Sequence, residues 1–309
     1  MIRPAPGAAP SVGVVIPTRG DRPAHLATAV RAALAQEHPG RISVVVVADG
    51  TPYETVTDRL AAVPTRAGRD VRVLPNCLTP GLPGARNTGI AASHTDLIAF
   101  CDDDDQWLPG KLAAQIAALA ETGAEFASCG IEVEHGGRRV PRLAGATTVT
   151  EADLLRSRMV MVHSSTFLFR RGTLWVDESA PCGQNEDWDL ALRAARRHPL
   201  ANVDRPLVRV RWGSSHYAAR WGERIAGLEW MLARHAGLAT DPRGAARVYG
   251  QLAFHHAALG HRREAGRWAL RAFATRRSEP RAPIALAVAA GLIPAARVLS
   301  LLHDRGHGI

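Results

Sequence analysis

Short apolar runs rich in β-branched residues alternate with amphipathic segments over the first third of the chain. SVGVVIP (residues 11–17) and ISVVVV (42–47) are typical of buried strands, and residues 22–38 between them carry apolar side chains at helical spacing. Residues 71–74 and the run DLIAFCD from Asp96 predict two further strands. Strands and helices that alternate in this way predict an α/β fold with a mostly parallel, doubly wound sheet.

Chain length and apolar content limit the domain organisation and the location. The 309 residues, 46% of them hydrophobic, are enough for one large α/β domain with an appendage or for two modest domains. The opening MIRPAPGAAPS has too few long apolar side chains for a signal peptide, and no uninterrupted apolar run reaches membrane length. We therefore expect a cytoplasmic protein.

Cysteine spacing and charge distribution argue against a zinc or iron–sulfur site and against a nucleic-acid partner. The four cysteines lie far apart in sequence, so they lack the paired spacing of zinc and iron–sulfur sites. The formal charge is −4 up to Leu192 and +13 from Arg193 onward. Because 37 of the 38 basic residues are arginine, with Lys111 the sole lysine, we attribute this asymmetry to compositional bias and expect no nucleic-acid partner.

Polar residues follow three of the predicted strands directly. They are Thr18 with Arg19, Asp49 with Gly50, and the aspartates 102–105. In doubly wound sheets, ligands bind outside the carboxyl ends of the strands. We therefore expect these three segments to line one crevice.

Four consecutive aspartates end the fourth predicted strand, in LIAFCDDDDQWLP (97–109). Their mutual repulsion is relieved by water or by a bound cation. An Asp-x-Asp spacing suits Mn²⁺ or Mg²⁺, with Asp102 and Asp104 as ligands and Asp105 in reserve. The alternative is a solvated acidic turn in which Asp105 caps a helix that begins near Leu108.

The segment GLPGARNTGI (81–90) combines glycines with two polar side chains. Its glycines allow close approach of the backbone, and a helix is expected to start after Gly84. Arg86 and Asn87, near that helix start, could face a phosphate or a base. The segment is not a dinucleotide fingerprint, because G-x-G-x-x-G is absent.

A third acidic group lies in GQNEDWDLALRAARR (183–197), where apolar residues recur at helical spacing. Glu186 and Asp187 then fall in or just before the first helical turn, where the helix dipole favours an ionised carboxylate. An ionised aspartate that faces a crevice is a competent general base for a hydroxyl group. The alternative is an acidic cap with no catalytic role.

Taken together, IPTRGDRP, VVVVADGT, GLPGARNTGI, FCDDDDQW and NEDWDLALR resemble, in order and spacing, the family 2 glycosyltransferases of the GT-A fold. The resemblance covers about Val12 to Arg211. It implies transfer of a sugar, with inversion, from a nucleoside-diphosphate donor, a UDP-sugar in the first instance. The acceptor would be a hydroxyl group of a glycan, a lipid-linked saccharide or a natural product.

The resemblance also implies roles for individual residues. Asp187 would be the general base, supported by Glu186 and Asp189, while Asp102 and Asp104 would hold the metal. The donor would be lined by Pro17, Thr18, Arg19, Asp49, Arg86, Asp102 and Asp103.

Two positions depart from the family pattern. The family often has two aspartates after its second strand, where this chain has Ala48 and Asp49. Many members also carry a histidine soon after an Arg-x-Arg strand, whereas VRVRWGSSHY places His216 slightly later. His216 is either a metal or diphosphate ligand or a surface histidine.

The chain changes character from about Ala218, where Ala, Arg and Leu recur at helical spacing. We therefore expect a catalytic domain over 1–217 and a helical region over 218–309. Residues 248–280 resemble one tetratricopeptide-type helix pair, or a hairpin that completes the enzyme's core. Residues 283–306 are apolar but contain Pro294 and Arg297, which excludes a spanning helix and leaves peripheral membrane contact or a homodimer contact.

Two other functions remain open at this point. A sugar-1-phosphate nucleotidyltransferase would need an early basic residue near the α-phosphate, for which Arg19 and Arg22 are the candidates. A helical-repeat adaptor that only binds nucleotide would not need acidic residues at both positions. MVHSSTFLFRRG (161–172) predicts a strand whose polar residues contribute to packing or acceptor contact, and it has no nucleophile-elbow pattern.

Overall fold

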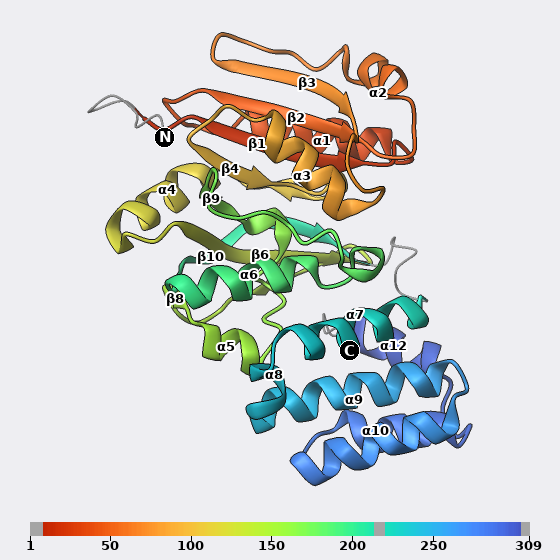
Figure 1. Ribbon diagram of the computed structural model, residues 1–309. Helices are drawn as coiled ribbons and strands as arrows, with labels where there is room; N and C mark the ends of the chain where they lie inside the picture. Colours follow the sequence, from red (N-terminus) through yellow and green to blue (C-terminus); the bar gives the residue numbers. More distant parts are fainter. Residues whose placement is uncertain (1–8, 213–219, 304–309) are drawn as a thin grey trace.

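The computed structural model describes residues 9–212 and 220–303 and contains one ten-stranded mixed sheet (Figure 1). The strand order is β3-β2-β1-β4-β9-β6-β10-β5, with β7 paired to β6 and β8 paired to β10. The strands are β1 (Val12–Thr18), β2 (Ile42–Ala48), β3 (Arg69–Pro75), β4 (Leu97–Phe100), β5 (Gln106–Trp107), β6 (Phe126–His135), β7 (Arg138–Arg142), β8 (Thr148–Val149), β9 (Leu168–Arg170) and β10 (Leu200–Arg211).

Helices cover both faces of this sheet and then form a C-terminal helical region. Within the sheet region they are α1 (Pro23–Leu34), α2 (Tyr53–Leu60), α3 (Leu82–Ala92), α4 (Lys111–Thr122), α5 (Glu151–Arg156) and α6 (Glu186–Arg197), with 3₁₀ turns at Ser164–Thr166 and Pro181–Gly183. The helical region holds α7 (Trp221–Arg234), α8 (Gly237–Thr240), α9 (Pro242–Ala258), α10 (Arg262–Thr275), α11 (Arg281–Ala289) and α12 (Ala295–His303).

The first four predicted strands form the parallel half of the sheet. β1 pairs in parallel with β2 and β4, and β2 pairs in parallel with β3, so that Thr18 lies beside Ala48 and Val15 beside Phe100. The carboxyl ends of these strands therefore meet at one edge. Beyond β4 the sheet becomes mixed, because β9 runs antiparallel to both β4 and β6. The predicted α/β fold is confirmed.

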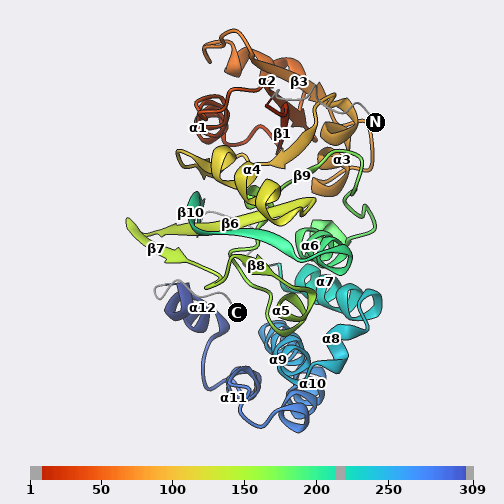
Figure 2. The ribbon, with the colours of Figure 1, turned by 90° about the vertical axis from the view of Figure 1, so that its left-hand side faces the viewer.

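Alternate side chains of the buried strands point to two different cores. Val14 of β1 packs in a cluster with α1, α2 and α4, whereas the adjacent Val15 packs with α3 and α6 on the opposite face. Figure 2 shows α1 and α4 on one side of the sheet and α3 and α6 on the other. This two-sided burial explains why the strand sequences are almost continuously apolar.

The helical region shares a core with the sheet region. Leu228 of α7 and Leu252 of α9 belong to the same buried cluster as Trp188 of α6. A second, alanine-rich cluster joins α9, α10, α11 and α12, and the region lies below the sheet in Figure 1. The predicted C-terminal helical region is confirmed, while its kinship with tetratricopeptide repeats and the boundary at 217 remain predictions.

None of the described helices is long and apolar enough to cross a membrane. Several large apolar side chains of the helical region are nevertheless exposed, among them Leu270 and Phe273 on α10 and Leu292 after α11. The predictions of peripheral membrane contact or a homodimer contact remain predictions.

Helix α3 depends on two glycines for its close packing. The helix begins at Leu82, earlier than the sequence-based expectation after Gly84, because Pro83 fits the first turn of a helix. A Cβ at Gly84 would lie 1.9 Å from the carbonyl oxygen of Thr79, and one at Gly89 would lie 2.2 Å from Cγ1 of Val15. Gly89 thus lets the helix that carries Arg86 lie directly on β1, and Gly84 lets its first turn lie against the backbone of Thr79.

We predict that Gly89→Ala lowers the free energy of unfolding by about 1–3 kcal/mol, because the added methyl group overpacks α3 against β1. Gly266→Ala is the matched control, since a Cβ at this position of α10 meets no atom within 4 Å. It should raise stability by about 0.5–1 kcal/mol. Urea denaturation measures both changes, and equal effects of the two substitutions would contradict the packing argument.

Candidate active site

The aspartates 102–105 form a largely buried loop after β4. Asp103 is 4% exposed and Asp105 is 2% exposed, so the alternative of a solvated acidic turn is wrong. Helix α4 begins only at Lys111, and the residue before it, Gly110, offers no side-chain cap. The loop therefore holds its carboxylates in fixed positions, where each contacts specific side chains.

Asp103 and Asp104 face the end of β1 and the start of α1. Thr18 Oγ1 donates a 2.6 Å hydrogen bond to Asp103 Oδ2, and Arg22 Nη2 lies 2.9 Å from Asp103 Oδ1. Arg22 also forms an ion pair with Asp104. Burial raises the pKa of Asp103 to about 6, although Thr18 and Arg22 act in the opposite direction. Asp104, predicted as a metal ligand, is thus paired with an arginine.

Asp102 and Asp105 lie together with His163, from the segment before β9. Potential ligand atoms of these three side chains all lie within 4.8 Å of one another. Ser164 Oγ donates to Asp102 Oδ2 at 3.0 Å, and Ser165 Oγ donates to Asp105 Oδ2 at 2.6 Å. The serines fix the orientation of both carboxylates.

This group fits a divalent cation. Burial raises the pKa of Asp105 well above its usual value, and the charges of Asp102 and Asp104 raise it further. Both causes, burial and the neighbouring negative charges, disfavour the ionised form of Asp105, and a dication would offset both. Carboxylate oxygens suit Mg²⁺ and Mn²⁺, and imidazole is a common ligand of transition metals.

Arg86 joins the aspartate loop to helix α6. Its side chain is 1% exposed, its Nη2 lies 2.7 Å from Asp102 Oδ1, and its Nη1 forms an ion pair with Glu186. Burial opposes its charge, yet Asp102 and Glu186 raise the pKa of Arg86 above its ordinary value. Arg86 contacts these two carboxylates and the ring of Phe100, and its predicted contact with the donor stays a prediction.

Asp187 lies at the amino end of α6, as the sequence predicted. Its Oδ2 accepts a 2.7 Å hydrogen bond from Arg158, and its Oδ1 accepts one of 2.8 Å from the backbone N–H of Trp188. Burial raises the pKa of Asp187, but Arg158, His163 and Arg86 lower it more, so its net shift is downward. In contrast, burial raises the pKa of Glu186 to about 7.

Asp189, expected to support Asp187, contacts other residues. It is fully buried and accepts hydrogen bonds from Arg193 at 2.8 Å and Arg234 at 2.5 Å, with His235 Nε2 at 2.9 Å. Because Arg234 and His235 lie at the end of α7, Asp189 fastens the helical region to α6. Burial opposes ionisation, but these partners lower the pKa of Asp189 to about 2.

The remaining predicted donor residues lie at the strand ends. Pro17 is buried and Arg19 is exposed. Asp49 accepts hydrogen bonds from Asn76 Nδ2 at 2.8 Å and from the backbone N–H of Gly81 at 3.0 Å, which links β2 to the start of α3. His216 lies outside the described residues.

Sequence reasoning missed the contribution of His163, Ser164 and Ser165 to the aspartate cluster. The predicted strand over 161–172 shrinks to β9 (Leu168–Arg170), and the three polar residues lie before and within a 3₁₀ turn. The sequence feature that could have identified these residues is a run of polar side chains immediately before a buried apolar run. The antiparallel pairing of β9 with β4 brings them to the aspartates.

The family model described as Glycosyl transferase family 2 matches residues 13–176, more than half of the chain. This chain is a member of glycosyl transferase family 2. The matched range includes the aspartate loop, Arg86 and His163 but ends before α6.

Curated relatives of this family 2 member agree with that assignment. The amylovoran biosynthesis glycosyltransferase AmsE of Erwinia amylovora is 30% identical over 205 residues, which are 62% of this chain and 72% of the relative. The UDP-Glc:alpha-D-GlcNAc-diphosphoundecaprenol beta-1,3-glucosyltransferase WfgD of Escherichia coli is 29% identical over 87 residues, 28% of this chain and 34% of the relative. The uncharacterized glycosyltransferase EpsJ of Bacillus subtilis is 28% identical, and the match covers 50% of this chain and 49% of the relative. The chain thus spans about a third of WfgD and about half of EpsJ.

Solved structures show the same fold along almost the whole chain. S. aureus TarS 1-349 in complex with UDP-GlcNAc superposes with a TM-score of 0.60 at 14% identity and covers 96% of this chain and 92% of that one. The mannosyltransferase PcManGT from Pyrobaculum calidifontis, in complex with GDP-Man and Mn²⁺, superposes with a TM-score of 0.57 at 18% identity. The match covers 97% of this chain and 81% of that one. The likeness to TarS includes the helical region and supports the GT-A fold.

We predict that Asp189→Asn lowers the free energy of unfolding by about 3 kcal/mol near neutral pH, because it removes the buried carboxylate that pairs with Arg193 and Arg234. The folded-state pKa near 2 lies below the ordinary value, so the stabilisation is complete above about pH 4 and is lost as pH falls toward 2. Denaturation at about pH 7 and pH 3 should show the difference from wild type shrink. A difference that grows in acid would contradict this assignment, and Asp58→Asn, at an exposed position of α2, serves as control.

We predict that Asp105→Asn and His163→Ala each weaken Mn²⁺ binding by about tenfold or more, because each removes one member of the ligand group. Asp104→Asn tests the sequence-based pair and should have the smaller effect, because its carboxylate is paired with Arg22. Calorimetric titration with Mn²⁺ in the presence of UDP measures all three. If Asp104→Asn alone abolished binding, the Asp102 and Asp104 pair would be favoured instead.

Proposed function

We propose that this protein is an inverting, metal-dependent glycosyltransferase that moves a sugar from a nucleoside-diphosphate sugar to an acceptor hydroxyl group. One observation carries the proposal: buried Arg86 contacts both Asp102 at the end of β4 and Glu186 at the start of α6. The group formed by Asp102, Asp105 and His163, here called the cation-binding group, therefore belongs to the same continuous cluster of charges as Asp187. Such a cluster suits a reaction with a metal on one side and a base on the other.

In the proposed reaction, the acceptor oxygen attacks the anomeric carbon while the bond from that carbon to the diphosphate oxygen breaks. Asp187, which is ionised because its pKa is lowered, takes the acceptor's proton, and the nucleoside diphosphate leaves. Mn²⁺ or Mg²⁺ bound by Asp102, Asp105 and His163 would supply positive charge that stabilises the departing diphosphate. A single displacement inverts the anomeric centre.

The choice of donor is supported by what the relatives bind. WfgD is named for UDP-Glc, the TarS structure contains UDP-GlcNAc, and the Pyrobaculum structure contains GDP-Man with Mn²⁺. We therefore infer a nucleoside-diphosphate sugar and place UDP-sugars before GDP-sugars. A thermal-shift screen of UDP-, GDP- and dTDP-sugars with Mn²⁺ identifies the donor.

The two alternative functions have less support. A nucleotidyltransferase would need Arg19 or Arg22 for the α-phosphate, but Arg22 is paired with Asp103 and Asp104, and Arg19 is exposed. An adaptor that only binds nucleotide would gain nothing from buried carboxylates whose pKa values are raised. We infer that these carboxylates are kept for catalysis.

We predict that Asp187→Asn keeps donor affinity within about twofold but slows nucleotide release by about 100-fold or more, because the amide cannot accept the proton. Donor binding is measured by thermal shift, and turnover by release of the nucleoside diphosphate with water as acceptor. Asp58→Asn, at an exposed position of α2, should change neither quantity. Loss of donor binding in Asp187→Asn would mean that the residue is structural.

A further inference from the structure

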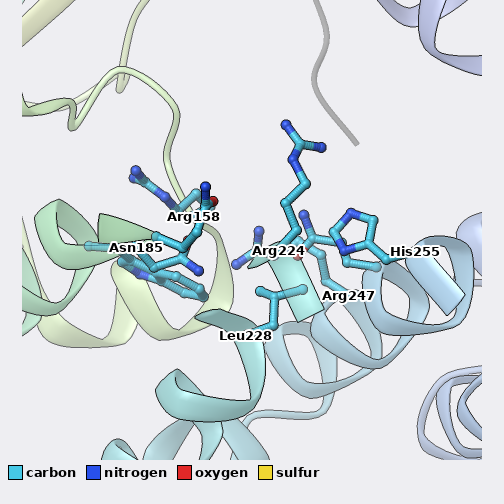
Figure 3. Close-up of a pocket in the computed structure, with 9 residues that line it drawn as sticks. Arg158, Asn185, Arg224, Leu228, Arg247 and His255 are labelled. Atoms are coloured by element: carbon cyan, nitrogen blue, oxygen red, sulfur yellow. The ribbon is translucent and has the colours of Figure 1, made fainter. Parts of the chain in front are cut away.

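A cationic pocket lies between α6, α7 and α9, next to Asp187. It encloses a cavity of about 180 Å³, below the range of about 300 Å³ and more that is typical of drug-sized ligands. Figure 3 shows its labelled lining residues, which come from both the sheet region and the helical region: Arg158, Asn185, Arg224, Leu228, Arg247 and His255. A cavity of this size suits one small polar group.

Arg247 carries a buried charge without a counter-ion in the pocket. Its Nε and Nη2 atoms are sealed from solvent and have no hydrogen-bond partner among the described residues. The guanidinium lies 5.1 Å from the centre of the Trp188 ring. Burial, reinforced by Arg281 and Arg158, lowers the pKa of Arg247 to about 9, so it is still charged at neutral pH. A buried charge of this kind destabilises the fold unless an anion pairs with it.

The other pocket residues add hydrogen-bond donors and positive charge. Burial lowers the pKa of Arg224, and burial together with the charge of Arg224 lowers the pKa of His255 to about 3. The ring nitrogens of His255 are buried and also lack a hydrogen-bond partner within 9–212 and 220–303. A neutral imidazole still has one N–H to donate.

Two carboxylates beside the pocket, Asp187 before Trp188 and Glu279, whose charge acts on Arg247, already have partners. Asp187 is held by Arg158 at 2.7 Å, and Glu279 by Arg281 at 2.7 Å. Arg224 and Arg247 therefore leave the pocket with a surplus of positive charge. A doubly charged phosphate, with several acceptor oxygens, matches two arginines better than a single carboxylate does.

We propose that this pocket binds a phosphate group of the acceptor and so delivers the acceptor hydroxyl to Asp187. The pocket and the base share a wall, because Arg158 contacts both and Trp188 follows Asp187 directly. The site is separate from the expected donor site, whose residues lie at the ends of β1, β2 and β4. The proposal rests on the proposed function and adds to it the chemical class of the acceptor.

The test is a calorimetric titration of the full-length protein with inorganic phosphate, with UDP and Mg²⁺ held at saturation so that the donor site is filled. We expect saturable binding to wild type and affinity about tenfold weaker or worse in Arg247→Gln and Arg224→Gln. Arg263→Gln, which removes an exposed arginine of α10, is the matched control and should bind phosphate like wild type.

Thermal melting separates a binding role from a structural one. Because Arg247→Gln removes an unpaired buried charge, its melting temperature without phosphate should equal or exceed that of wild type. Phosphate should then raise the melting temperature of wild type and leave that of the variant unchanged. A variant that melts lower and binds phosphate normally would overturn the proposal.

The two proposals fail in different ways. Phosphate affinity that is the same in wild type, Arg247→Gln and Arg224→Gln would overturn the pocket assignment and leave the glycosyltransferase proposal intact. If wild type binds no nucleoside diphosphate, the proposed function falls, while phosphate binding that depends on Arg247 still assigns the pocket as an anion site.

Discussion

The ion pairs of Arg86 are the interaction on which the candidate site depends. An arginine that is 1% exposed must be compensated, and it is compensated from two directions, by Asp102 and by Glu186. These partners belong to different parts of the chain, one at the end of a parallel strand and one at the start of α6. Burying the guanidinium between them fixes the position of the predicted base relative to the cation-binding group.

The close packing of α3 makes this arrangement possible. Gly84 and Gly89 bring the helix onto Thr79 and β1, so that Arg86, between them in sequence, is carried into the interior. Around it the carboxylates divide into two sets. Asp103 and Asp104 share Arg22, whereas Asp102 and Asp105 lie with His163, and among the described residues Asp105 has only His163 as an ion-pair partner. This division favours the second set as the place for a dication.

The fold and part of the site could be predicted because their signals are local. The β-branched runs that become β1 and β2, and the placement of Asp187 in the first turn of α6, follow from periodicity within about fifteen residues. The ligand group could not be predicted in the same way. His163 reaches Asp105 only because β9 pairs antiparallel with β4, and Arg22 reaches Asp104 across 82 residues of sequence. Such pairings depend on tertiary structure, so the spacing of four aspartates could not show which side chain each of them contacts.

The same limit applies to the helical region. Its arginines looked like compositional bias, yet Arg224 and Arg247 line a pocket beside the predicted base, and Arg234 binds Asp189 beneath it. The region is therefore part of the candidate catalytic unit, since it shares a core with α6. Nothing in the local sequence distinguishes Arg247 of α9 from the other arginines. Its place in the pocket follows only from the packing of α9 near Trp188 of α6 and Arg224 of α7.

The central claim is that the acids after β4 form a cation site connected through Arg86 to the base on α6. Anomalous diffraction from crystals grown with UDP and Mn²⁺ tests it most directly. The account predicts one strong manganese peak bonded to Asp102, Asp105 and His163, with the nucleotide diphosphate beside it and Arg86 still paired with Glu186. A peak at Asp103 and Asp104 alone, or a nucleotide bound away from the aspartate loop, would contradict it.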